Sequence, residues 1–201
     1  MALFRQRIQF PQFIADLITC QFDFLASNFD KLIVLADESH ALGETDRQEI
    51  FEKTHALIVV NILLRCTQYF SNTLSSEAAG EAVSMVYGKY LTEYRNVPKA
   101  VAEQKMGKVL LLLDLVSKAE VDVHARNADY RNIADASFPS IVGDVNKQQF
   151  YLCSAFAAYC AGDSLRDAGW ESKRFAAFRL AKGIVGGDIV GNARGRYRVI
   201  F

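Results

Sequence analysis

The chain has 201 residues, of which 51% are hydrophobic and 23% are charged, and its formal net charge is zero. This composition is typical of a globular protein and excludes a disordered chain. A neutral chain also has no overall field that would draw it onto nucleic acid or an anionic membrane. The longest apolar runs, residues 56–64 and 109–116, are too short to span a bilayer.

The four cysteines stand in apolar stretches and include no Cys-x-x-Cys pair. Cysteines of this kind are typical of buried free thiols in a reducing compartment. The first residues lack the apolar core of a secretory signal. We therefore expect a cytoplasmic protein without a membrane segment.

Residues 11–39 are predicted to form a long helix, because apolar side chains recur there at three- and four-residue steps. The same segment could instead form two helices broken near Ser27–Asn28. Acidic residues recur along it every seven positions and would form a line on the helix surface. The line consists of Asp16, Asp23, Asp30 and Asp37.

Residues 46–74 are predicted to form a second helix, with Thr45 or Asp46 as its N-cap. Its middle, residues 56–64, is apolar on every side except one, so we expect it to be buried in the core. A third helix is expected from Ser75 to about Arg95.

The third helix carries a stripe of small residues at four-residue steps, formed by Gly80, Ser84 and Gly88. Glycine in a helix interior costs about 1 kcal/mol relative to alanine. Two glycines at this spacing therefore predict that another helix, in this chain or in a second copy, approaches the stripe closely.

Three more helices are predicted in the second half of the chain. Their bounds are 98–121, 145–161 with Gly162 as C-cap, and 164–183 with an alternative break at Gly169. Residues 122–144 lack periodicity, so we expect a long loop there with room for one short helix. The fold class is thus all-α, a single-domain bundle of about six helices over residues 1–183.

Residues 184–201 are predicted to be a Gly/Arg-rich tail. Its last residues alternate between apolar and basic side chains from Tyr197 onward, which is a weak signal for one short strand. Arginine mixed with glycine and tyrosine also resembles segments that contact single-stranded nucleic acid. The neutral charge of the chain counts against that interpretation.

Glu52 and His55 form a Glu-x-x-His pair, the spacing that dimetal bundle proteins use to hold a metal. His124 is the third candidate ligand, but the second Glu-x-x-His motif that such sites need is missing. A single Glu-x-x-His pair is common by chance, and exposed polar residues near a helix start are the preferred interpretation. Which cofactor the protein takes, if any, stays open.

Asn61 and Asp114 each interrupt an otherwise apolar helix segment. A buried lone carboxylate is costly unless it is paired or protonated. The two side chains could hydrogen-bond to each other, or line a pocket for a polar ligand. Alternatively, Asp114 could point outward through a gap between helices.

The front of the chain is acidic and its end is basic, so the basic tail could lie along the aspartate line of this chain or of a second copy. The arginines concerned are Arg194, Arg196 and Arg198. We therefore expect a non-enzymatic protein-interaction module that acts as a homodimer. The alternatives are a bundle that binds a small ligand or metal, with or without enzymatic activity, and a nucleic-acid accessory protein that uses the basic tail.

Overall fold

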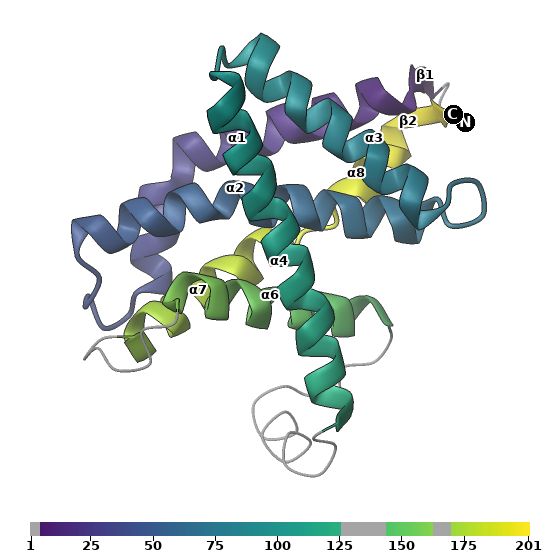
Figure 1. The fold of residues 1–201 in the computed structure, drawn as a ribbon. Coiled ribbons are helices and arrows are strands. Elements are labelled where there is room, and N and C mark those ends of the chain that lie inside the picture. The colour runs from purple at the N-terminus through teal and green to yellow at the C-terminus, as the bar shows by residue number, and fades with distance from the viewer. Residues whose placement is uncertain (1–4, 126–143, 163–169) are drawn as a thin grey trace. The chain divides into compact units, whose positions relative to one another are not determined.

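The computed structural model describes residues 5–125, 144–162 and 170–201 (Figure 1). The described residues are mostly helical, which confirms the predicted all-α class, and they include one short parallel strand pair. None of the described helices combines the length and the apolar character that a membrane crossing requires. In chain order the elements are β1 (Gln6–Gln9), α1 (Phe10–Ala36), α2 (Glu44–Tyr69), α3 (Ser76–Lys89), η1 (Tyr90–Tyr94), α4 (Lys99–Ala125), α6 (Asp144–Ala161), α7 (Trp170–Val185), α8 (Ile189–Arg196) and β2 (Tyr197–Ile200).

The chain divides into two compact units. Unit 1 comprises Met1–Phe29, Thr54–Val109 and Gly187–Phe201, and unit 2 comprises Asp30–Lys53 and Leu110–Gly186. Helices α1, α2 and α4 therefore each begin in one unit and continue into the other. Each unit has buried apolar side chains of its own, such as Phe13 and Leu57 in unit 1 and Ile50 and Phe156 in unit 2.

Helix α1 is continuous, without the alternative break near Ser27–Asn28. It has Pro11 in its first turn, where the missing N–H has no helical partner to lose. The helix ends at Ala36 because the next residue, Asp37, turns its carboxylate onto the following backbone. That carboxylate accepts hydrogen bonds from the N–H groups of Ala41 and Leu42, both at 3.1 Å.

Helix α2 begins at Glu44, earlier than the capping residues predicted from the sequence. The carbonyl of Gly43 accepts the first-turn hydrogen bond from Arg47, so Thr45 and Asp46 lie within the helix. Residues 56–62 are all buried, which confirms the predicted core segment. The helix ends at Tyr69, five residues before the predicted end at 74.

Helix α3 begins after Ser75, whose hydroxyl accepts a hydrogen bond from the N–H of Ala78 at 3.1 Å. The prediction of a close helix neighbour at the small-residue stripe is wrong for the part of the chain that the structure describes. A Cβ atom added at Gly80 or Gly88 would meet nothing within 4 Å, so the stripe faces open space.

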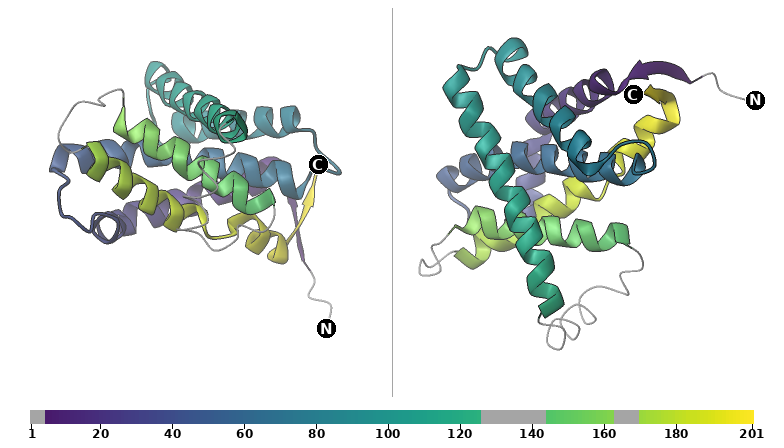
Figure 2. Two further views of the ribbon diagram at one scale, coloured as in Figure 1. Left: turned by 90° about the horizontal axis from the view of Figure 1, so that it is seen from below. Right: turned by 45° about the vertical axis from the view of Figure 1, so that its right-hand side comes forward.

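Helix α4 starts directly after Pro98 and continues to Ala125, so residues 122–125 are helical rather than part of the predicted loop. The rest of that predicted loop, residues 126–143, lies outside the described residues. Helices α6 and α7 pack side by side in unit 2 (Figure 2). Gly162 ends α6 with φ at +67°, as a C-cap glycine does.

The segment predicted as a tail contains a helix and a strand. Helix α8 is capped by Asp188, whose carboxylate accepts from the N–H of Gly191 at 2.9 Å. Strand β2 then pairs in parallel with β1 (Figure 1), and the register places Arg7 opposite Arg198. The predicted C-terminal strand is therefore present, and its partner comes from the start of the chain.

Candidate functional site

A groove of about 690 Å³ opens on unit 1 between α1 and the α3–η1 segment, with Tyr197 of β2 also lining it. Exposed residues of α1 at three- and four-residue steps form one wall. The lining residues are Pro11, Gln12, Ala15, Asp16, Thr19 and Cys20 of α1, Val86 and Lys89 of α3, Tyr90, Glu93 and Tyr94 of η1, and Tyr197. We call this surface the tyrosine groove.

The opposite wall contains a π-helical turn. The N–H of Arg95 donates to the carbonyl of Tyr90 at 3.0 Å, which closes the wider i to i+5 ring. The rings of Tyr90 and Tyr94 are stacked, with centroids 5.8 Å apart and planes inclined by 14°. Tyr90 is buried whereas Tyr94 is 73% exposed, so one ring supports another that faces solvent. Single π-helical turns occur frequently at functional sites.

The groove has carboxylates on both walls. Asp16 and Glu93 are exposed, and Asp16 accepts a hydrogen bond from the Gln12 amide at 2.7 Å. Lys89 supplies the positive charge among the lining residues. Burial raises the pKa of the Tyr90 hydroxyl, and the net shift stays upward although Arg95 opposes it. Tyr90 is therefore a neutral hydrogen-bonding phenol at neutral pH.

Cys20 lies on the groove and is exposed, whereas the other three cysteines of the chain are buried. Burial raises the pKa of Cys66, Cys153 and Cys160 to about 12 each. Because the thiolate is the reactive form, these three thiols are inert as well as covered. Cys20 is therefore a position at which a thiol reagent can label the groove.

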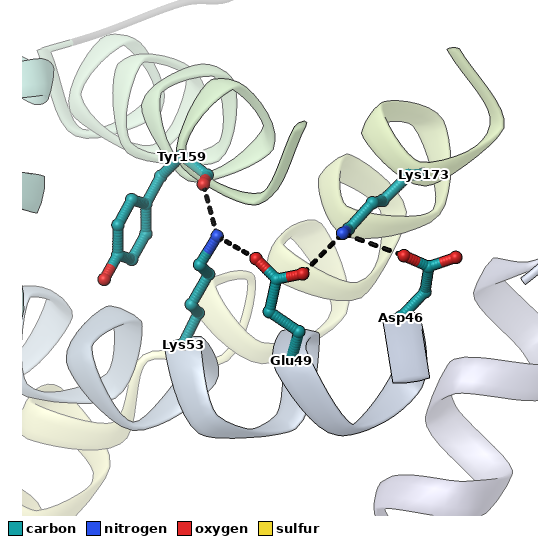
Figure 3. A network of polar contacts seen from close by, with 5 residues as sticks. All are labelled: Asp46, Glu49, Lys53, Tyr159 and Lys173. Atoms are coloured by element: carbon teal, nitrogen blue, oxygen red, sulfur yellow. Dashed lines mark hydrogen bonds and ion pairs between the residues drawn. The ribbon is translucent and has the colours of Figure 1, made fainter. Parts of the chain in front are cut away.

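Unit 2 holds a network of charged side chains that ties α2 to α6 and α7 (Figure 3). Lys173 contacts Asp46 at 2.9 Å and Glu49 at 2.6 Å. Lys53 contacts the same Glu49 at 2.5 Å and donates to the backbone carbonyl of Tyr159 at 2.8 Å. Every charged group in this network contacts a group of opposite charge. We therefore interpret the network as one that stabilises the packing of α2 against α6 and α7.

A smaller cavity of about 330 Å³ lies in unit 2, beside the turn after α1 and the exposed face of α7. The guanidinium of Arg179, which lines this cavity, forms an ion pair with Glu38 at 2.7 Å. The carboxylate of Asp37, another lining residue, already accepts two backbone hydrogen bonds and lies 3.8 Å from the Arg47 guanidinium. Asp37 and Arg179 are therefore already engaged within the chain.

Glu52 and His55 lie one helical turn apart on the continuous helix α2. Glu52 is exposed, while the His55 ring packs edge-on against Phe22, with ring centroids 4.7 Å apart. The side chain of His124 lies outside the described residues. Among the side chains that are described, no three His, Cys, Asp or Glu residues form a cluster able to hold a metal.

Asn61 is buried, but Asp114 is exposed, so the alternatives that bury the Asp114 carboxylate do not hold. Its side chain is 53% exposed and contacts Lys118 at 2.5 Å, one helical turn further along α4. The segment around it is only partly covered, with Leu110 61% and Leu111 48% exposed. Asp114 therefore points outward, one of the alternatives considered above.

The aspartate line is interrupted at its end. Asp16, Asp23 and Asp30 are exposed, but Asp37 is buried in the turn that it caps. No ion pair joins these aspartates to the arginines of the tail within the described residues. Arg194 instead lies over the rings of Tyr69 and Phe70, at 4.9 and 5.2 Å from their centroids. The two other tail arginines, Arg196 and Arg198, are exposed.

Sequence reasoning missed the tyrosine groove. The available signal is the run of tyrosines at positions 87, 90 and 94, but their spacing does not show that Tyr94 faces solvent whereas Tyr87 and Tyr90 are buried. Comparisons with protein-family models, with curated proteins and with solved structures found no significant match to this chain. Functional inference therefore depends on the geometry alone.

Proposed function

We propose that this protein is a non-enzymatic interaction module that binds a partner protein through the tyrosine groove. The occupant is an extended segment carrying an arginine or lysine side chain. The observation that supports this proposal is the exposed ring of Tyr94, stacked on Tyr90 and flanked by the carboxylates of Asp16 and Glu93.

The chemistry of the groove suits a cation on an extended chain. A guanidinium or ammonium group is attracted to the face of a tyrosine ring, and more strongly where water is partly excluded. Nearby carboxylates supply charge-assisted hydrogen bonds to the same group. Arginine fits best, because its planar fork can stack on Tyr94 and reach a carboxylate at the same time.

Cys20 provides the test. Alkylation of Cys20 by iodoacetamide would be followed by mass spectrometry in the presence of a Gly-Arg repeat peptide and of a matched Gly-Glu peptide. We expect the arginine peptide to slow alkylation in a saturable way and the glutamate peptide to leave it unchanged. Both substitutions Tyr94→Ala and Glu93→Gln should weaken this protection.

Matched control variants are available on other exposed surfaces. Glu103 is an exposed acid on α4, so Glu103→Gln removes the same charge away from the groove. Phe175 is 67% exposed in unit 2, so Phe175→Ala removes an exposed ring elsewhere. Protection that is absent at millimolar peptide, or that falls equally in the control variants, would reject the groove as the binding site.

The homodimer and the cytoplasmic location expected from the sequence are part of the same proposal. Among the described residues nothing lies within 4 Å of a Cβ added at Gly80 or Gly88, which leaves room there for a second copy. Three buried free thiols suit a reducing compartment. Light scattering across a concentration series tests the dimer, and a monomeric mass at every concentration would reject it.

A further inference from the structure

The two ends of the described chain bring four arginines together in unit 1. Arg7 of β1 lies directly opposite Arg198 of β2 in the parallel register. Arg5 immediately precedes β1, and Arg196 immediately precedes β2. We call this set the arginine ribbon. Of these four arginines, only Arg196 and Arg198 were identified from the sequence, because Arg5 and Arg7 lie nearly 200 residues earlier in the chain.

The two paired arginines of the ribbon, Arg7 and Arg198, face away from the tyrosine groove. Tyr197 points toward the body of unit 1, where its ring lies 6.3 Å from that of Phe13. Adjacent residues of a strand point to opposite faces of the sheet, so Arg198 points outward. Residues in register across a sheet share a face, and Arg7 therefore points outward beside it.

All four arginines are exposed, and within the described chain none of them has an ion pair, a side-chain hydrogen bond or a ring contact. Elsewhere in unit 1, by contrast, Arg194 is held over two rings. Like charges placed directly opposite each other destabilise a sheet. A bound anion would convert this repulsion into charge-assisted hydrogen bonds.

We propose that the arginine ribbon binds a small soluble ligand that carries two adjacent phosphate groups. Guanidinium groups match phosphate oxygens in bidentate geometry. Neighbouring strands are roughly 4.8 Å apart, so the guanidinium groups of Arg7 and Arg198 can converge on one diphosphate. The neutral net charge of the chain favours such a compact ligand over a nucleic-acid strand, which needs a longer basic track.

Inorganic pyrophosphate is the probe. It would be titrated calorimetrically into the full chain at fixed ionic strength, and the arginine Nε–H signals would be followed by NMR. We expect saturable binding with one site per chain, weakened about tenfold by either Arg7→Gln or Arg198→Gln. The conservative variant Arg7→Lys should bind with an intermediate affinity, because lysine keeps the positive charge but lacks the planar guanidinium group that donates two parallel hydrogen bonds.

One double variant carries Arg7→Gln and Arg198→Gln. It would be compared with a control double variant that carries Lys31→Gln and Lys99→Gln. Both lysines are exposed and lie outside the ribbon, so this control removes the same charge. Circular dichroism establishes that each variant is folded. Equal weakening in the two double variants, or no saturable binding by wild type, would overturn the site. A single-stranded oligonucleotide whose affinity rises with its length and exceeds that of pyrophosphate would overturn the small-ligand assignment.

Discussion

Replacing Lys173 by methionine should destabilise the protein by about 2 kcal/mol. The ammonium group contacts two carboxylates in the network of Figure 3. A hydrogen bond to a charged group contributes roughly 1.5–3 kcal/mol where it is buried. The side chains of Asp46 and Glu49 are 40% and 42% exposed, so solvent screening reduces each contribution. Glu49 keeps Lys53 as a partner, so no buried charge is stranded.

The pH dependence of this penalty follows from two pKa shifts. Burial alone raises the pKa of Glu49, but the hydrogen bonds and charges of Lys173 and Lys53 outweigh it, so that the pKa lies below 4.5. A carboxyl with a lowered pKa stabilises the fold above its unfolded value and loses this contribution as the pH falls through its folded value. Burial lowers the pKa of Lys173, whereas its carboxylate partners raise it above 10.5 overall. Its contribution is lost only as the pH rises through that folded value.

Thermal unfolding of wild type and Lys173→Met across the pH range measures the effect. At neutral pH we expect the melting temperature to fall by roughly 4–8 °C. Because the pKa of Glu49 is lowered, the difference should shrink only at pH values below the ordinary titration range of a glutamate, as Glu49 becomes protonated. Lys118→Met is the control, because that pair is exposed on one helix and should contribute less than about 0.5 kcal/mol. A penalty of the same size at acid and neutral pH would refute the electrostatic explanation.

Three further results are expected. A thiol reagent should modify Cys20 rapidly in the folded protein and leave the other three cysteines unmodified until denaturant is added, which counting of labelled thiols by mass spectrometry checks. Gly191→Ala should destabilise by about 1–3 kcal/mol, because the new Cβ would collide with the capping carboxylate of α8. Gly195→Ala in the same helix meets open space and should be neutral or slightly stabilising by urea unfolding. Asp37→Ala should cost about 2–3 kcal/mol in urea unfolding, because it removes the acceptor of the buried Leu42 N–H group; unchanged stability would contradict its role in the turn.

The helices were predictable because their signals are local. Period-3.6 apolar stripes identified α1 and α2, and Ser75, Pro98 and Gly162 marked the start or the end of three others. Boundaries were less accurate where the role of a polar side chain in a turn decides them. The end of α1 depends on the Asp37 carboxylate, whose pattern in the sequence suggested only another surface aspartate.

What the sequence could not predict depends on pairs of residues that are distant along the chain. A glycine-rich segment gives little intrinsic reason for a helix, yet α8 forms because Asp188 caps it and also hydrogen-bonds to the Tyr69 hydroxyl. The groove likewise exists only where α1 meets the α3–η1 segment and β2. The sequence also could not predict which way a side chain faces. A polar residue in an apolar helix segment, such as Asp114, can point into the core or toward solvent.

The pairing of β1 with β2 also has a consequence for biosynthesis. As the ribosome extends the chain, β1 emerges first but has no partner until residues 197–200 have been translated. Until then Phe10 and Phe70 lack the ring of Phe201, which lies 5.0 and 5.1 Å from theirs in the folded protein. Unit 1 is therefore completed only after residue 201 has been translated. A nonsense mutation between codons 197 and 201 would leave Phe10 and Phe70 without this ring and expose an aromatic cluster to the quality-control machinery of the cell.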